Sequence, residues 1–383
     1  MLRFAARRGA QMAALFVVFL SLLFALLNAQ PGSITDQYLS NPRIPPEARQ
    51  MLAERLGLDR PLTEQYVAYM RNFFTGNLGV SFSEYPRPVV DILAERLPRT
   101  VFLFLTATLL AYWVGFKAGK ILVWRRGKAI EHTVNVVGIV LTTIFEPWFY
   151  LLMISVFSFM LGWFPTGKFI DNARWAGAPF SVNTVFGRML LSAGIAAAVL
   201  AAALAAARRA GHPRLRVTLR WGGVALVVAG LLTYWLTSPM RVYAADIAWH
   251  TILPVCSLTL VAFGGVMLLM RSSMLETLRE DYVFTARAKG LPERVIRDRH
   301  AARNALLPLV TSLTFSIATV MGGGVITESI FSWPGMGQAL LNAVVLKDIP
   351  LAVGALAFLG ALALIAHLLA DIFYTFLDPR LRT

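Results

Sequence analysis

The sequence has little charge and almost no cysteine. Charged residues make up 15% of its 383 residues and hydrophobic residues 57%, whereas a soluble domain carries about 25% charged residues. The single cysteine, Cys256, excludes an internal disulfide and a cysteine-cluster metal site. The apolar residues fall in blocks of about 18–30, long enough to cross a hydrocarbon core as helices. The sequence therefore predicts an all-α, polytopic membrane protein.

Acidic residues are the scarcer charge, with 21 Asp and Glu against 36 Lys and Arg. The basic residues cluster in alternate short connections, as the positive-inside rule requires of cytoplasmic loops. We therefore expect no nucleic-acid partner, and we predict about eight transmembrane helices with both termini in the cytoplasm. The predicted spans are residues 11–29, 101–123, 134–162, 189–207, 221–237, 250–270, 306–327 and 351–377.

The blocks divide the chain into five regions. The alanine-rich pair of spans has no recognisable chemistry, and removing it leaves the orientation of the others unchanged, as a tolerated insertion must. The first block is predicted to be a retained helix, although a cleaved signal peptide is the alternative. The predicted regions are a first transmembrane helix (1–30), an extracytoplasmic cap segment (31–100), a transmembrane core (101–180), an inserted helix pair (181–240) and further core (241–383).

The cap segment carries helical signals. Prolines 45 and 46 with Glu47 predict a helix start, and Gly57 predicts its end. A second helix has one strongly apolar face. Either this face packs on the membrane helices, or the segment contacts a protein that delivers substrate. The face consists of Tyr66, Tyr69, Met70, Phe73 and Phe74.

The connection at residues 271–305 is long for a loop, which indicates structure of its own. A helix is predicted from Thr277 to Lys289, with Gly290 as its stop and Pro292 in the first turn of a second helix. Such a helix–Gly–helix elbow would lie at the cytoplasmic membrane surface. The alternative is a solvated basic loop without a partner. Two i,i+4 ion pairs are expected in the second helix, Glu293–Arg297 and Arg294–Asp298.

Several runs resemble one transporter family. The run EDYVFTARAKGL at residues 280–291 resembles the cytoplasmic signature loop of binding-protein-dependent ABC permeases of the dipeptide/oligopeptide type. The outer run ESIFSWPGMG at residues 328–337 is similar to the same family. Shorter matches are RHAARNALLP (299–308), LGLDRPL (56–62), GNLGVS (76–81) and LDPR (377–380).

The resemblance implies a mechanism. Two permease chains, expected to be different, would form a pathway across a bacterial cytoplasmic membrane for a peptide delivered by an extracytoplasmic binding protein. Two partner ATPases would bind ATP and Mg²⁺, so no cofactor or metal is expected in this chain, and hydrolysis would not be its own activity. A short helix at about 281–289 would dock on an ATPase. The coupling residues would be Asp281, Tyr282, Thr285, Ala286, Arg287, Ala288, Lys289 and Gly290.

The sequence departs from the family pattern at three places. Phe284 stands where a basic residue is common, and Glu146-Pro147 stands where a small polar residue and proline are more usual. Residues 181–240 add two spans to an expected core of six.

Pathway and gate candidates lie in or beside the predicted spans. An ionisable residue within a span is a functional candidate by default, and Pro147 predicts a kink next to Glu146. Glu146 is expected either to line the pathway, or to make a structural hydrogen bond or meet the other permease. The outer turn is either near a gate or an interfacial anchor. The candidates are Glu146, Pro147, Glu328, Trp333, Pro334 and Gly335.

Other functions fit the sequence less well. An ion-coupled secondary transporter would want more midplane polar residues on broken helices. A permease for nickel or another small solute fits the same motifs, whereas a scaffold would not need the long structured loop. An enzyme is disfavoured because no nucleophile is paired with a base. The run GWFPTGKF at residues 162–169 resembles a phosphate loop but ends in Phe169 instead of Ser or Thr.

Overall fold

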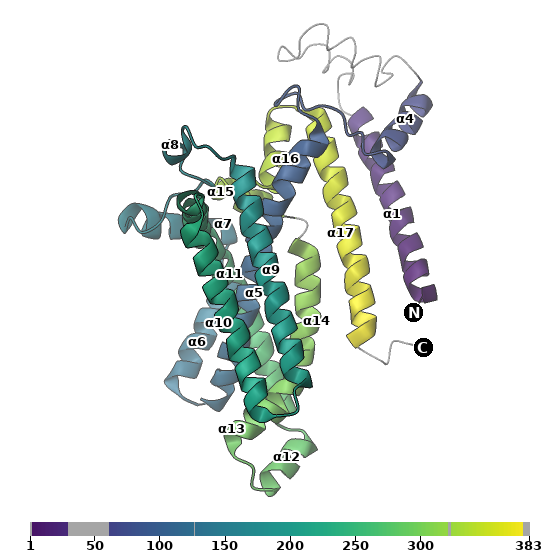
Figure 1. Ribbon diagram of the computed structural model, residues 1–383. Coiled ribbons are helices and arrows are strands. Elements are labelled where there is room, and N and C mark those ends of the chain that lie inside the picture. Colours follow the sequence, from purple (N-terminus) through teal and green to yellow (C-terminus); the bar gives the residue numbers. More distant parts are fainter. Residues whose placement is uncertain (1, 30–60, 126, 321–322, 378–383) are drawn as a thin grey trace. The chain divides into compact units, whose positions relative to one another are not determined.

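The computed structural model describes residues 2–29, 61–125, 127–320 and 323–377 (Figure 1). These residues form helices, and their one β contact is a bridge between Val80 and Pro88. The all-α prediction is confirmed. The helix predicted to start at prolines 45 and 46 lies outside the described residues.

The helices keep the order of the predicted blocks. Two six-residue segments, η1 and η2, are π-helical. The elements are α1 (Leu2–Asn28), α4 (Leu62–Phe74), α5 (Val89–Trp124), α6 (Ala129–Thr143), α7 (Glu146–Ile154), η1 (Ser155–Met160), α8 (Asn172–Trp175), α9 (Val182–Arg209), α10 (Pro213–Thr237), α11 (Arg241–Thr277), α12 (Asp281–Ala288), α13 (Glu293–Val295), η2 (Ile296–Ala301), α14 (Ala302–Val320), α15 (Val325–Ile330), α16 (Met336–Val345) and α17 (Ile349–Leu377).

Six of the described helices are long and apolar enough to cross a membrane, namely α1, α5, α9, α10, α11 and α17. A seventh candidate is the pair of α6 with α7 and η1. Helix α14 covers most of the predicted span 306–327 but is not among these candidates. The polytopic membrane architecture is thus confirmed, whereas the number eight and the side of the termini stay predictions.

Residues 134–162, predicted as one span, do not form one continuous helix. Helix α6 ends at Thr143, α7 begins at Glu146, and the two halves are bent by 108°. Pro147 lies in the first turn of α7, where its missing N–H costs no helical hydrogen bond. A helix running through this position would lose that bond and clash with the ring, so the predicted kink is confirmed.

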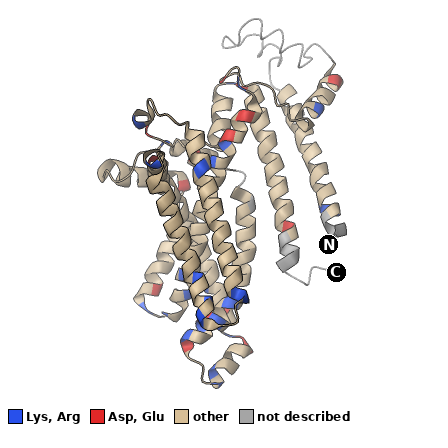
Figure 2. Cartoon of the chain, viewed as in Figure 1, with Lys and Arg blue, Asp and Glu red and all other residues tan. Residues whose placement is uncertain are grey.

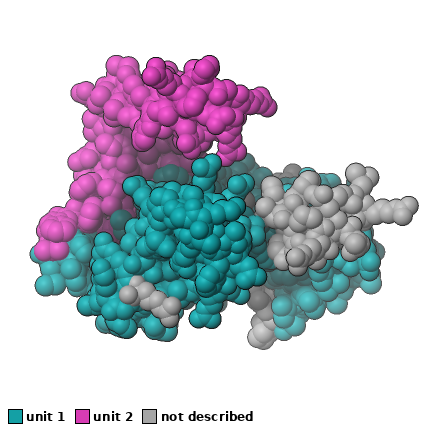
Figure 3. All heavy atoms as spheres, turned by 90° about the horizontal axis from the view of Figure 1, so that it is seen from below, with its two compact units in different colours: residues 1–160, 254–383 teal, residues 161–253 magenta. Residues whose placement is uncertain are grey.

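The described chain separates into two compact units (Figure 3). Unit 1 contains residues 1–160 and 254–383, and unit 2 contains residues 161–253. Each is described by itself below.

Close helix contacts in unit 1 rely on glycine. A Cβ on Gly119 of α5 would overlap Met270 of α11, and a Cβ on Gly264 of α11 would overlap the Gly138 carbonyl of α6. Small residues allow such close approach, which membrane helices need because lipid provides no hydrophobic drive between them. Helices α5, α6 and α11 therefore pack backbone against backbone.

The apolar face predicted in the cap segment packs on membrane helices. Tyr69, Met70 and Phe73 of α4 pack around buried Leu20 of α1 and Ala357 of α17. This packing prediction is confirmed. Contact with a delivering protein stays a prediction.

Unit 2 is a helical hairpin with a short preceding segment. Helices α9 and α10 lie antiparallel, with a close approach of Gly223 to Ala203 and a 3.3 Å hydrogen bond from Trp235 Nε1 to Ser192 Oγ. At the other end of the unit, buried Asp246 accepts hydrogen bonds from the Asp171 N–H at 3.0 Å and from Trp175 Nε1 at 2.9 Å. That carboxylate ties the segment before α9 to α11.

Candidate functional site

The long connection after α11 forms a compact helix–Gly–helix element. We call residues 278–301 the elbow. Its helix does not run from Thr277 to Lys289 as predicted, because α11 ends at Thr277 and α12 starts at Asp281. Glu280, in extended geometry with ψ 145°, interrupts the hydrogen-bond ladder. The reorientation lets α12 bury its own apolar residues, which a straight helix would leave in water.

Gly290 ends α12 in the manner predicted. Its φ is +74°, the Gly290 N–H bonds the Arg287 carbonyl at 2.9 Å, and the Leu291 N–H bonds the Ala286 carbonyl at 3.3 Å. This pair of bonds is the Schellman motif, which favours glycine at the left-handed position. The bend is therefore fixed by backbone chemistry.

A small core holds the elbow together. Val283 and Ala286 of α12 pack on Ile296 of η2, with Leu278 partly buried beside them. Ala286 was predicted to contact a partner, but its side chain is 5% exposed and belongs to this core. Because of this burial, Ala286 can support the exposed face of α12 but cannot be part of it.

The rest of the predicted coupling set lies on the exposed side of α12. Phe284 is exposed as well, at 63%, although the sequence argument treated it only as a departure from the pattern. In α12 the buried residues Val283 and Ala286 are three positions apart and share one face of the helix, and Phe284 lies off that face. The exposed members are Asp281, Tyr282, Thr285, Arg287, Ala288, Lys289 and Gly290.

Ion pairs bind the two limbs of the elbow and join it to α5. Arg287 Nε lies 3.0 Å from Glu293 Oε1, so Glu293 pairs across the bend and not with Arg297 as predicted. The predicted Arg294–Asp298 pair is present at 4.0 Å.

Asp298 carries the connection to α5. Arg297 donates to its carboxylate at 2.8 Å, and Lys120 of α5 lies 3.1 Å away. The Arg297 hydrogen bond, helped by Lys120, lowers the pKa of Asp298 well below its usual value. The elbow is thus tied electrostatically to a long membrane helix.

The predicted gate residues assemble around a buried carboxylate. Glu328 is fully buried and accepts hydrogen bonds from Thr100 Oγ1 of α5 at 2.7 Å and from the Gln338 N–H at 2.9 Å. A Cβ on Gly335 would overlap that carboxylate and the Thr100 hydroxyl. Any larger residue at position 335 would therefore clash with these two side chains.

Trp333 and Pro334 complete this cluster, which we call the outer node after the side on which the sequence predicts it. The Trp333 side chain is fully buried, and its Nε1 donates to the Arg99 carbonyl at 3.1 Å. Pro334 is partly buried beside it. The tryptophan thus packs within the protein, while a gating role stays a prediction.

A second buried carboxylate, Asp348, was missed by the sequence argument. It accepts hydrogen bonds from the Ser83 N–H at 2.8 Å, from Ser83 Oγ at 2.7 Å and from Ser81 Oγ, and its other oxygen accepts from the Leu351 N–H at 3.2 Å. An Asp immediately before a helix that has Pro350 in its first turn was the available signal. Asp348 anchors the segment before α5 to the start of α17.

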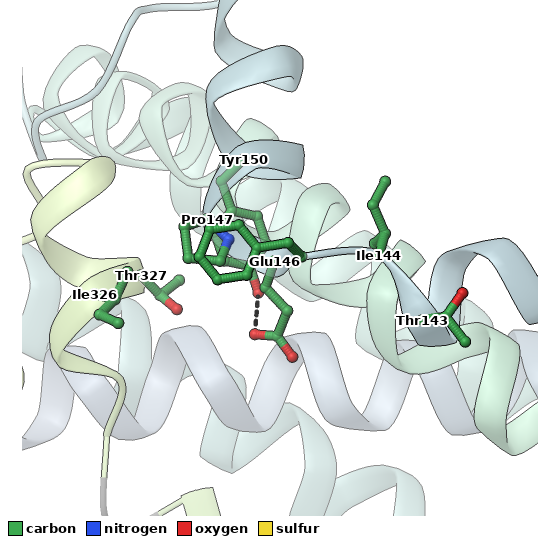
Figure 4. Close-up of a pocket in the computed structure, with 8 residues that line it drawn as sticks. Thr143, Ile144, Glu146, Pro147, Tyr150, Ile326 and Thr327 are labelled. Carbon is green, nitrogen blue, oxygen red and sulfur yellow. Dashed lines mark hydrogen bonds between the residues drawn. The ribbon is translucent and has the colours of Figure 1, made fainter.

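Glu146 and Pro147 lie at a pocket of about 450 Å³ beside the break between α6 and α7 (Figure 4). Tyr150 Oη donates to Glu146 Oε2 at 3.1 Å. Tyr150 and Thr327 are lining residues that the sequence argument missed. Among the described residues, no Lys, Arg or His lines the pocket, whose remaining lining residues are Thr143, Ile144, Phe145 and Ile326.

Metal binding has no geometric support in the described ranges. No group of three or more His, Cys, Asp or Glu side chains there is arranged to hold an ion.

Comparison with known proteins gives the family. Residues 224–383 match the family model described as binding-protein-dependent transport system inner membrane component, and residues 1–104 match the N-terminal model of the same system. The di/tripeptide transport system permease protein of Pseudomonas aeruginosa is 32% identical over 100% of this chain and 99% of the relative. The chain belongs to this family of binding-protein-dependent transport system membrane components.

Two further relatives span nearly the whole chain. The dipeptide transport system permease protein of Escherichia coli K12 is 30% identical, covering 100% of this chain and 99% of the relative. The oligopeptide transport system permease protein of Bacillus subtilis is 28% identical, covering 94% and 93%. The family resemblance inferred from the short runs is confirmed. This member of the family is a multi-pass transport component.

Proposed function

We propose that this chain is a permease subunit of an ABC importer for short peptides in a bacterial cytoplasmic membrane. Three relatives named for dipeptide, di/tripeptide or oligopeptide transport support the substrate class. The single observation that carries the coupling role is the elbow, whose exposed α12 face stands on its own small core.

In this proposal, α12 docks on a partner ATPase. Tyr282, Phe284 and Thr285 offer an exposed apolar and hydroxyl surface, and Lys289 adds a positive charge. The partner would bind ATP and Mg²⁺, and closure of two ATPases would push on α12. The Asp298–Lys120 ion pair gives that push a route to α5.

The other partners follow from the same proposal. A second, different permease would complete the pathway, and an extracytoplasmic binding protein would deliver the peptide. The elbow and the outer node around Glu328 both contact α5, through Lys120 and Thr100 respectively. A displacement of α5 would therefore move its contacts with both the elbow and the outer node.

The experiment is peptide uptake by the complex purified through this chain and reconstituted in liposomes. ATPase subunits are expected to copurify, and uptake is expected to require ATP and the binding protein. Gly290→Pro should uncouple hydrolysis from uptake, because proline cannot adopt the positive φ of this residue. Uptake driven by an ion gradient with no ATPase present would instead support a secondary transporter. ATP-driven uptake of nickel but not of peptide would change the substrate class.

We also propose that Glu146 lines the pathway. Its carboxylate lies at a pocket whose described lining holds no cationic side chain, and a charge without a cationic partner is costly within a membrane unless it faces water or a charged ligand. Glu146→Gln should therefore lower the maximal uptake rate of peptides while leaving ATPase copurification unchanged. A matched Glu64→Gln change, at an exposed position of α4, should alter neither. Unchanged uptake in Glu146→Gln would contradict this assignment.

A further inference from the structure

The α9–α10 hairpin has a charge distribution unlike the rest of the chain. Between Asp171 and Asp246 the sequence contains no acidic residue. Five arginines gather where α9 ends and α10 begins (Figure 2). We call this region, residues 208–220, the hairpin tip, and all five arginines are exposed. They are Arg208, Arg209, Arg214, Arg216 and Arg220.

Nothing in unit 2 neutralises this charge. Its only carboxylates, Asp171 and Asp246, lie at the opposite end of α9. Helix α9 has 28 residues, so these acids are about 40 Å away at 1.5 Å per residue. That distance is several Debye lengths at physiological salt, which are about 8 Å each. Within unit 2, the positive charge of the tip is therefore uncompensated.

The helices on which the tip stands indicate where it lies. Both α9 and α10 pass the length and hydropathy test for a membrane span, and no residue in either tested window is buried. Trp221, the residue after Arg220, is 71% exposed. Tryptophan beside arginine at the end of an apolar helix is typical of the membrane–water interface. The tip thus lies at headgroup depth.

Part of the tip is held in a fixed conformation. Arg216 Nε donates to the Ala210 carbonyl at 2.7 Å, which closes the turn between the helices. Arg208 and Arg209 occupy the last turn of α9, where the partial negative charge of the helix end favours cations. Guanidinium groups match phosphate oxygens bidentately.

We propose that the hairpin tip is a binding site for anionic phospholipid headgroups, and that the α9–α10 hairpin anchors the permease in an anionic lipid environment. The ligand chemistry is a phosphodiester at the membrane surface. The proposal does not depend on the transported substrate.

The test uses the full chain in two kinds of nanodisc, one of phosphatidylcholine alone and one that also contains phosphatidylglycerol. Native mass spectrometry measures the lipid that the protein retains, and thermal unfolding is measured in both kinds of nanodisc. The main variant combines Arg208→Gln, Arg209→Gln, Arg214→Gln and Arg220→Gln, and it keeps Arg216 because that side chain closes the turn. The matched control removes four exposed arginines outside the tip and the elbow, at Arg71, Arg188, Arg241 and Arg303. A third variant places lysine at the four tip positions.

The wild-type chain is expected to retain phosphatidylglycerol preferentially and to melt at a higher temperature with it. Each tip arginine should contribute about a fivefold preference, so the glutamine variant should lose most of it. The control and the lysine variant should keep it, because the tip keeps its charge in both.

Three outcomes would overturn the proposal. If the glutamine variant keeps the full phosphatidylglycerol preference, the tip arginines do not bind the lipid. Competition by inorganic phosphate as strong as that by the lipid would make the site a general anion site. If the glutamine variant loses a protein subunit but keeps its lipid preference, the tip is a protein-docking surface.

Discussion

The elbow and the hairpin tip are both arginine-rich connections, but only the elbow carries acids of its own. In the elbow, Arg287 pairs with Glu293 and Arg297 with Asp298. In the tip, unit 2 offers no acid within reach of its five arginines. Internal ion pairs make a fixed shape suited to one partner protein, whereas uncompensated charge suits a fluid anionic surface. In our two proposals the same excess of arginine therefore has different uses, and the presence or absence of paired acids distinguishes them.

The largest expected effect on ATPase binding comes from placing a charged residue in the small hydrophobic core of the elbow, which the hairpin tip lacks. Val283→Asp would place a carboxylate against Ile296, where Val283 is fully buried. Burying an unpaired charge costs several kcal/mol, so ATPase copurification and peptide uptake should both be lost. Copurification after affinity capture of this chain measures the first, and liposome uptake the second.

Its matched change is Leu215→Asp in the hairpin tip, where the leucine is 49% exposed. This variant should keep the ATPase. Equal loss of ATPase in both variants would mean that the two regions dock the same partner, and the comparison would fail.

The next effect concerns charge reversal. Arg287→Glu would replace the 3.0 Å pair with Glu293 by repulsion and should lower peptide-stimulated ATPase activity several-fold. Arg214→Glu should leave that activity unchanged and lower the phosphatidylglycerol preference. Hydrolysis assays in both lipid compositions separate the two, and a reversed pattern would exchange the roles assigned to the elbow and the tip.

A smaller effect concerns the two glycine turns. Gly290 has φ +74° with open space around it, so Gly290→Ala should destabilise the elbow by about 1 kcal/mol through backbone strain alone. Gly211 in the tip also has open space, but its φ is outside the left-handed range, so Gly211→Ala should be near neutral. Hydrogen exchange of the α12 and α10 amides measures both local stabilities. Equal changes in amide protection in the two variants would show that the positive φ of Gly290 does not contribute to the stability of the elbow.

The smallest expected effect is a response to acid. The folded-state pKa of Asp298 is below its unfolded value because Arg297 and Lys120 hold the charged form. Its stabilisation is therefore present above about pH 4 and is lost as the pH falls further. Amide exchange in the elbow should rise below that pH, and Asp298→Asn should flatten the response. The hairpin tip contains no carboxylate, so an equal acid response of the α10 amides would contradict the assignment.

Much of the fold followed from local sequence. The spans at residues 101–123 and 351–377 lie within α5 and α17, and the span at 11–29 lies in α1 except for its last residue, because long apolar blocks can satisfy their backbones in lipid only as helices. Pro147 indicated the break in the third block, and Gly290 the bend of the elbow. The predicted helix beginning at Thr277 was wrong because the chain changes direction after Thr277 so that Val283 can be buried against Ile296. These two residues lie on different elements, so the periodicity within one helix does not reveal their contact.

The sequence by itself determined the class of the protein, its family motifs and the imbalance of charge along the chain, since these depend on composition and on short runs. The tertiary structure decided which residues meet. It placed Glu328 on Thr100, Asp348 on Ser83 and Asp298 on Lys120. These partners are far apart in the chain, and no local periodicity specifies them. The packing of helices brings them together, because a buried carboxylate is stable only where donors converge on it.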